Sequence, residues 1–198
     1  MMAHILDLVR HALRYIAIAT ILAAACGQPK LAGTELGATD APDFTLTDGL
    51  TGKAIQLSAH RGRVVALTFL YTTCPDVCPL TATQFKLAQE RLASDANNVT
   101  FIAVSIDPDR DTPQAAQQFS AAHGLSRNWY YLVGGHAQLA PVWSSYGIGV
   151  QPDSGNMTVS HNDAVYLIDK RGRERVLLHS DALGTDLFDD LRALTRES

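Results

Sequence analysis

The sequence predicts an α/β domain, a mixed β-sheet with helices on both faces. Two continuous runs of β-branched and aromatic residues, 64–71 (VVALTFLY) and 99–106 (VTFIAVSI), are typical of strands covered on both faces. Segments with the apolar spacing of a helix follow both runs. A strand–turn–strand pattern near the end of the chain adds antiparallel strands to the parallel ones. Alternating strands and helices with a late hairpin indicate this fold class.

The composition is that of an ordinary globular domain with an acidic surface. The chain has 198 residues, of which 46% are hydrophobic and 18% are charged. This length fits one domain with a targeting segment. The formal net charge is -4, so the chain has no basic field that would hold a phosphate backbone. We therefore expect no nucleic-acid partner.

The first 25 residues have the pattern of a lipoprotein-type signal peptide. Arg10 and Arg14 precede an uncharged run, residues 15–25 (YIAIATILAAA), which ends in small residues directly before Cys26. This run is shorter than the roughly 20 residues that cross a bilayer. The residues before Cys26 resemble a lipobox, so we predict lipidation of Cys26, with simple cleavage or an uncleaved anchor as alternatives. The protein is expected on the periplasmic face of a bacterial membrane.

Residues 26–41 are predicted to be a flexible tether that joins this anchor to the folded domain, residues 42–198. The segment contains Gly, Pro and small polar residues and lacks apolar periodicity. It would hold the domain away from the membrane.

The elements of the domain follow from apolar periodicity and turn residues. Asp48-Gly49 is a turn signal between two short alternating segments, so an N-terminal β-hairpin opens the domain. Thr112 is the expected N-cap of a helix with Pro113 at its first position. Residues 147–159 are expected to be a loop. In chain order the predicted strands are residues 43–47, 54–57, 64–71, 99–106, 129–133, 164–169 and 173–178, and the predicted helices are residues 80–92, 113–123, 136–146 and 185–195.

Cys74 and Cys78 lie where the first buried strand meets a helix, in the sequence TTCPDVCP. A helix N-terminus has free N–H groups and a positive partial charge, so a thiol there ionises readily. Because Pro79 suits a first helical position, we place Cys78 near the N-cap as the better stabilised thiolate, with Cys74 in the preceding turn. The spacing allows a disulfide or a shared metal ion. Inert buried thiols or a structural disulfide are the alternative.

A cysteine pair at such a junction narrows the fold class to a thioredoxin-like arrangement. Thiolates select soft metals, and an imidazole added to two thiolates suits copper in either oxidation state. His161 is the candidate imidazole, because the loop before the strand at residue 164 abuts the cysteine turn in this arrangement. A plain loop histidine is the alternative reading. The remaining histidines after the signal are expected to be surface or capping residues: His60, His123, His136 and His179.

Several aspartates lie close to these motifs. Asp76, between the cysteines, either supports the site through hydrogen bonds or satisfies free N–H groups at the helix start. Turn formation and helix capping account for Asp107, Asp109 and Asp111.

Three segments of the chain resemble the Sco/SenC family of copper proteins. They are residues 72–79 (TTCPDVCP), residues 104–113 with the pieces VSIDP and DTP, and residues 160–169 with SHND followed by YLID. The resemblance extends over about residues 43–194. The cysteine block together with the downstream histidine is a far more specific signature than the cysteine spacing alone.

The resemblance implies a metal site and a biological role. Cys74, Cys78 and His161 would be the ligands of copper, as Cu(I) or Cu(II). The protein would be a membrane-tethered periplasmic metallochaperone that helps to assemble the dinuclear copper A centre of cytochrome c oxidase. Its expected partners are subunit II of that oxidase or another copper enzyme, a thiol reductant, and the membrane through the lipid anchor.

The alternative function is that of a thiol–disulfide oxidoreductase. Cys74 and Cys78 would then be a catalytic redox pair that reduces the cysteines of a partner. Whether the protein is an enzyme is thus left open, and His161 distinguishes the two hypotheses, because disulfide exchange does not need it. A thiol peroxidase is disfavoured, because Leu67 and Tyr71 stand where peroxiredoxins carry Pro and Thr.

Overall fold

The computed structural model describes residues 30–152, 159–161, 163–179 and 183–197, and for residues 151–152 and 159–161 it describes the backbone alone. The predicted signal peptide, Cys26 and the side chain of His161 lie outside the described part. The chain divides into two units, Met1–Lys30 and Leu31–Ser198, and the fold is that of the second unit. None of the described helices has the length and apolar character that spanning a bilayer requires.

The strands of the described residues are β1 (Thr34–Asp40), β2 (Thr45–Asp48), β3 (Ala54–Gln56), β4 (Val64–Leu70), β5 (Val99–Ser105), β6 (Trp129–Val133), β7 (Val150–Pro152), β8 (Val159–His161), β9 (Val165–Ile168) and β10 (Arg173–Leu178). Eight of them form one mixed sheet in the order β1-β10-β9-β4-β5-β6-β2-β3. The three strands β4, β5 and β6 are parallel to one another, and every other neighbouring pair in this sheet is antiparallel. β7 and β8 form a separate pair.

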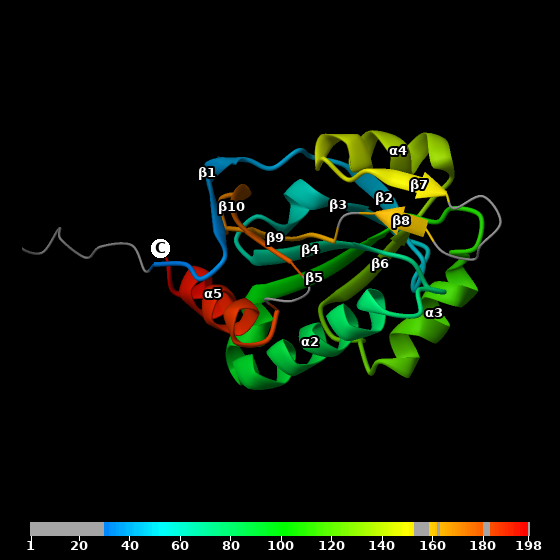
Figure 1. Cartoon of the computed structure of the whole chain (residues 1–198). Helices are drawn as coiled ribbons and strands as arrows, with labels where there is room; N and C mark the ends of the chain where they lie inside the picture. The colour runs from blue at the N-terminus through cyan, green and yellow to red at the C-terminus, as the bar shows by residue number, and fades with distance from the viewer. Residues whose placement is uncertain (1–29, 153–158, 162, 180–182, 198) are drawn as a thin grey trace, which may run out of the picture. The chain divides into compact units, whose positions relative to one another are not determined.

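The helices cover both faces of the sheet. They are α2 (Val77–Leu92), α3 (Pro113–Ala122), α4 (His136–Ser145) and α5 (Thr185–Arg196), with the 3-10 helices η1 (Leu57–His60) and η2 (Ala93–Asn98). Figure 1 shows α4 on one face and α2, α3 and α5 on the other. The predicted mixed sheet with helices on both faces is confirmed, as is the N-terminal hairpin, which is formed by β2 and β3.

The hydrophobic core lies around the two central strands. Every residue of β4 and of β5 is buried, because both faces of these strands are covered by helices and loops. Aromatic side chains join the strands to α2, where the rings of Phe85 and Phe101 have their centroids 5.2 Å apart. The continuous apolar runs of the sequence therefore correspond to the centre of the sheet.

The predicted tether is partly wrong, because residues 31–41 belong to the folded unit. β1 pairs with the edge of β10, Leu31 is buried, and Asp190 of α5 accepts hydrogen bonds from the N–H groups of Ala32 (2.7 Å) and Gly33 (3.1 Å). A side chain at Gly33 would lie 2.4 Å from Val176, so glycine allows this close approach. Edge pairing uses backbone groups and leaves most side chains of β1 exposed, so it produces no apolar pattern.

The predicted loop 147–159 also contains strand residues. Its first part includes β7, whose Val150 pairs with His161, and its last residue begins β8. Pairs this short carry too few residues for a periodicity that the sequence could reveal.

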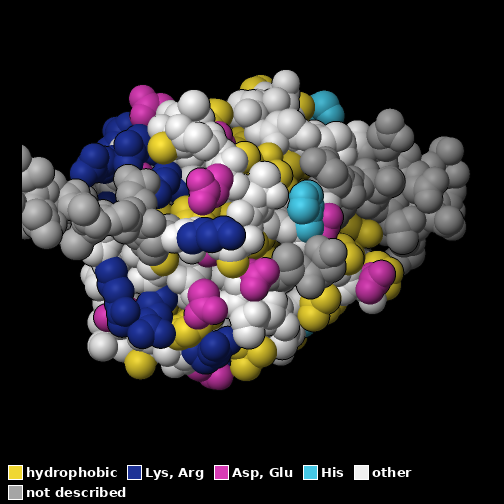
Figure 2. All heavy atoms as spheres, turned by 60° about the vertical axis from the view of Figure 1, so that its left-hand side comes forward, with side chains coloured by type: hydrophobic (Ala, Val, Ile, Leu, Met, Phe, Trp, Pro, Cys, Tyr) yellow, Lys and Arg dark blue, Asp and Glu magenta, His cyan; other side chains and the backbone are white. Residues whose placement is uncertain are grey.

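The surface of the described residues shows mixed charge. On the face in Figure 2, Lys and Arg side chains lie among Asp and Glu, and hydrophobic side chains are visible only in small separate areas. The exposed large hydrophobic side chains of the described part are Leu80 and Leu87, both on α2.

Candidate metal and redox centre

The cysteine turn connects the end of a central strand to the start of a helix. β4 ends at Leu70, whose carbonyl accepts a hydrogen bond from Ile106 N (3.0 Å) of the neighbouring β5 end. The chain then turns, with Cys74 N donating to the Tyr71 carbonyl at 3.3 Å, and α2 begins at Val77. The site therefore lies at the carboxyl end of the parallel strands, where α/β proteins commonly bind ligands.

Cys74 Sγ lies against the first N–H groups of α2. The backbone N–H of Cys78 donates to Cys74 Sγ at 3.4 Å, and Cys74 is 8% exposed. The pKa of Cys74 is lowered to about 5, first because the Cys78 thiol donates to it and further by the backbone N–H groups of Asp76 and Cys78, against the opposing effect of burial. The sulfur occupies the place of a helix-capping acceptor, so Cys74 is a thiolate at neutral pH.

Cys78 has the opposite character. Its side chain is 0% exposed, and its pKa is raised well above that of an ordinary thiol, chiefly because it donates a hydrogen bond to Cys74 and also by burial. The prediction that Cys78 is the better stabilised thiolate is therefore wrong. The helix begins at Val77, with Asp76 at the N-cap, so Cys78 lies inside the first turn and points into the core while Cys74 receives the N–H groups.

Asp76 does not cap the helix with its side chain. It is exposed at the N-cap position, and its side chain makes no capping hydrogen bond. Cys74 Sγ takes that role, so the second explanation offered for Asp76 is wrong. A role of Asp76 in supporting the site beside the metal ligands stays a prediction.

His161 is placed by its backbone. It ends β8, four residues before β9 begins at Val165, and Val165 pairs with Thr68 near the end of β4. Thr68 Oγ1 also donates to the carbonyl of Ala164 at 3.0 Å. Because β9 is antiparallel to β4, its start lies at the end of the sheet that carries the cysteine turn, and β8 leads into it.

The other histidines of the described part lie against aromatic rings or backbone groups. The ring of His123 is tilted against that of Phe119, with centroids 4.6 Å apart, and His136 meets Trp143 edge to face at 5.5 Å. Ring or backbone contacts also hold the remaining two: His60 against Tyr130, and His179 against the carbonyl of Asp163. Among the described side chains no group of three or more His, Cys, Asp or Glu is placed to hold a metal.

One buried carboxylate was not identified from the sequence as part of this region. Asp111, expected to shape a turn, accepts hydrogen bonds from the backbone N–H and the hydroxyl of Thr72, within the cysteine turn. Asp107 instead pairs with Arg110, and Asp109 is exposed. The explanation of Asp111 by turn formation is therefore incomplete. No local pattern marks its link to the cysteine turn, because Thr72 is 39 residues away in the sequence.

The donor set fits a soft metal or a redox reaction. Both cysteines lie within one turn and neither is in a disulfide. The lowered pKa of Cys74 favours its thiolate form, and thiolate sulfur selects Cu(I), Zn or related soft ions. The same two thiols can close a disulfide, because hydrogen-bonded sulfurs are already adjacent.

Comparison with known proteins shows the family to which the chain belongs. A sequence profile described as SCO1/SenC matches residues 33–196. The chain belongs to the SCO1/SenC family. A SCO2-like protein of Rickettsia typhi is 26% identical to this SCO1/SenC protein over 154 residues, which cover 75% of this chain and 74% of the relative. Protein SenC of Rhodobacter capsulatus is 30% identical over 106 residues, or 52% of this chain and 47% of the relative.

Solved structures of the family have the same fold. Apo Sco1 of Thermus thermophilus superposes with a TM-score of 0.72 at 30% identity, covering 83% of this chain and 97% of that one. ScoI of Bradyrhizobium japonicum, solved with copper bound, has a TM-score of 0.69 at 29% identity, covering 79% and 99% of the two chains. The thioredoxin-like fold and the family resemblance predicted from the sequence are thereby confirmed.

Proposed function

We propose that this SCO1/SenC protein is a metallochaperone that binds copper and delivers it to, or prepares, the copper A site of cytochrome c oxidase. Cys74, Cys78 and His161 would hold the metal, as Cu(I) or Cu(II). The observation that carries the proposal is the pair of free cysteines at the start of α2, where the backbone N–H of Cys78 donates to Cys74 Sγ and the pKa of Cys74 is lowered. A relative at 29% identity was solved with copper bound.

The difference in pKa between the two cysteines predicts the order in which they bind the metal. Cys74 is a thiolate before metal arrives and is the more exposed of the two, so it makes the first bond. Cys78 then releases its proton as the metal takes the place of the hydrogen bond between the sulfurs. His161 would supply the third ligand, and a copper enzyme would take the ion by exchanging its own ligands for these three.

The cellular setting belongs to the same proposal. Lipidation of Cys26 would anchor the protein to the periplasmic face of a bacterial membrane, and subunit II of cytochrome c oxidase or another copper enzyme would receive the metal. A thiol reductant would keep the cysteines reduced in an exported compartment, where disulfides otherwise persist. The lack of a nucleic-acid partner remains a prediction from the net charge of -4.

Anaerobic titration of the reduced protein with Cu(I) tests the metal site. We expect one copper per chain, and we expect His161→Ala to weaken retention by about 100-fold, since even residues that only support a ligand are worth 10- to 100-fold. His123→Ala is the matched control, because the ring of His123 packs against Phe119 and is not expected to bind metal. Unaltered copper retention in His161→Ala would remove the three-ligand site.

The sulfur asymmetry also supports a second candidate function, thiol–disulfide exchange. The Cys74 thiolate would attack a partner disulfide and form a mixed disulfide, releasing one partner thiolate. Cys78, giving up its proton, would then attack Cys74 Sγ and free the second partner thiol, so two electrons pass to the partner. If the folded, dithiol-active protein takes up no copper in the titration, this oxidoreductase function replaces the metallochaperone.

A further inference from the structure

A carboxylate is buried directly behind the cysteine turn. Asp111 is 4% exposed and accepts four hydrogen bonds. One oxygen receives the N–H and the hydroxyl of Thr72, at 2.8 and 2.6 Å. The other receives the hydroxyls of Ser105 (2.6 Å) and Tyr131 (3.0 Å). Asp111 therefore connects the cysteine turn to the last residue of β5 and to the middle of β6.

The hydrogen bonds of Asp111 suit an ionised carboxylate. All four of its partners can donate, so both oxygens are satisfied without a proton on the carboxyl group. Burial raises the pKa of Asp111 above its ordinary value, and the bonds from Ser105, Thr72 and Tyr131 reduce this rise. No ion pair found between described residues includes Asp111. The neighbouring cation Arg110 pairs with Asp107.

The hydrogen bonds from Thr72 hold the Asp111 carboxylate against the cysteine turn, two residues before Cys74. In agreement with this placement, the negative charge of Asp111 is the last of the causes that raise the pKa of Cys78, after the hydrogen bond to Cys74, burial and the charge of Cys74. The pKa of the fully buried Tyr131 is raised by burial and by the charge of Asp111. The carboxylate, the phenol and the sulfur are all buried, and charges interact strongly in such surroundings.

The oxidation state of bound copper changes the charge of the centre. Two thiolates and a neutral imidazole with Cu(II) have a net charge of zero, and with Cu(I) a net charge of minus one. Reduction adds one electron to the metal and no proton to the ligands. A fixed negative charge nearby destabilises the anionic Cu(I) form more than the neutral Cu(II) form.

We propose that Asp111 is a positioning residue that sets the oxidation-state preference of the copper centre, by keeping a fixed negative charge behind Cys78 that favours Cu(II) over Cu(I). The inference rests on the proposed copper function. It requires no contact between Asp111 and the metal, because the charge acts through the buried region and through Thr72 in the cysteine turn.

Asp111→Asn separates the charge from the geometry. The amide has the same size, its oxygen can keep both bonds from Thr72, and the hydroxyls of Ser105 and Tyr131 can rotate to accept from its NH₂ group. Asp48→Asn is the matched control. Asp48 is equally buried and bonds Thr51 Oγ1 and the backbone N–H of Tyr131, but it has no bond to the cysteine turn.

The experiment compares Cu(I) and Cu(II) affinities of the intact protein by competition with chromophoric chelators. For Asp111→Asn we expect the ratio of Cu(I) to Cu(II) affinity to rise at least tenfold, which corresponds to a one-electron potential higher by about 59 mV. The sulfur-to-Cu(II) absorption band should keep its position, since the ligands stay in place. Asp48→Asn should leave the ratio unchanged.

The experiment distinguishes failure of the inference about Asp111 from failure of the proposed copper function. One copper per chain with an unchanged ratio in Asp111→Asn would overturn this inference and leave the metallochaperone intact. Failure of the unmodified protein to bind either ion would overturn the proposed function, and this inference with it. If Asp111→Asn does not fold, Asp111→Ser decides, because it also removes the charge and its hydroxyl can still accept a hydrogen bond. The ratio should again rise, and a ratio that falls or stays constant would contradict the inference.

Discussion

At the scale of single residues, two thiols in one turn differ because their surroundings differ. Cys74 and Cys78 are four positions apart, yet the pKa of one is lowered and that of the other is raised. The N–H groups at the start of α2 point at Cys74 Sγ, whereas the side chain of Cys78 is directed into the core. Hydrogen bonds to the charged form and burial of the neutral form therefore assign the roles of thiolate and thiol.

This asymmetry predicts the pH dependence of alkylation. In the reduced protein, iodoacetamide should label Cys74 first, with a rate that rises through about pH 5 and is level at neutral pH, because the pKa of Cys74 is about 5. Mass spectrometry of the labelled peptides identifies the site. Cys78→Ala removes the largest cause of the low pKa, so the midpoint should move upward. A wild-type midpoint above pH 8 would contradict the prediction.

At the scale of elements, the sequence predicts those that depend on local signals and misses those that depend on contacts between distant segments. The start of α3 follows from the sequence, since Thr112 Oγ1 accepts from Ala115 N at 3.2 Å and Pro113 is the first helical residue, as predicted. β1 was not predicted from the sequence, because the strand pairs with β10, more than a hundred residues away. The residues just before it are held by Asp190 of α5, which is equally distant in the chain. An edge strand of this kind depends on backbone groups, which every residue has.

Asp190 is expected to hold the beginning of β1. Asp190→Ala removes the acceptor of the Ala32 and Gly33 N–H groups, which should lower the free energy of unfolding by about 1–3 kcal/mol. Urea unfolding measures the loss, and faster hydrogen exchange at these two amides locates it. Asp189→Ala, at the exposed neighbouring position, should change neither. Equal effects of both substitutions would show that β1 does not depend on this carboxylate.

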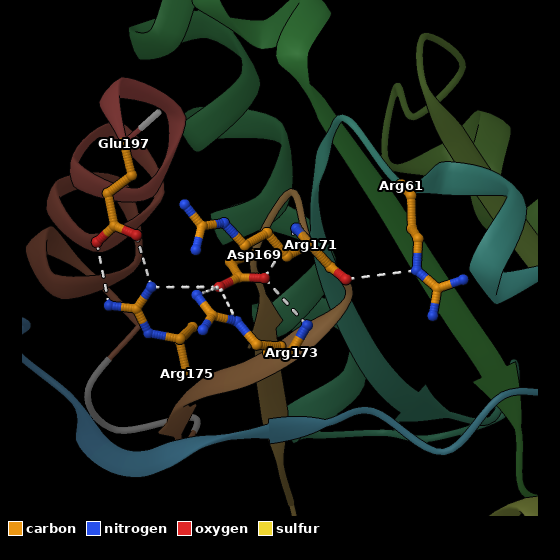
Figure 3. Close-up of polar contacts among 6 residues, drawn as sticks. All are labelled: Arg61, Asp169, Arg171, Arg173, Arg175 and Glu197. Carbon is orange, nitrogen blue, oxygen red and sulfur yellow. Dashed lines mark hydrogen bonds and ion pairs between the residues drawn. The ribbon is translucent and has the colours of Figure 1, made fainter.

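At the scale of the whole molecule, one carboxylate joins the β9–β10 turn to the end of the last helix. Asp169 accepts from Arg173 and Arg175, and Arg175 also pairs with Glu197 directly after α5 (Figure 3). Burial alone would raise the pKa of Asp169, but the bonds from Arg173 and from the N–H of Arg171 lower it below its ordinary value. The network therefore stabilises the ionised form.

The stability of the protein should consequently depend on Asp169 at low pH. Because the pKa is lower in the folded state, the contribution is complete above about pH 5 and is lost as the pH falls below about 4. Asp169→Asn should cost about 3 kcal/mol at pH 7 and much less at pH 3, as measured by urea unfolding at both values. Asp109→Asn, at an exposed position, serves as the control. A cost independent of pH would show that the charge of Asp169 is not what stabilises the network.

The sequence by itself determined the central strands, the cap of α3, the cysteine pair and the family. The strands, the cap and the cysteine pair depend on residues close together in the chain, and the family resemblance depends on three short segments that are each read locally. The tertiary structure decided which thiol is ionised, that residues 34–40 form a strand, and that Asp111 lies behind the cysteine turn. These features arise from burial and from hydrogen bonds between segments distant in the sequence, and such contacts exist only after the chain has folded.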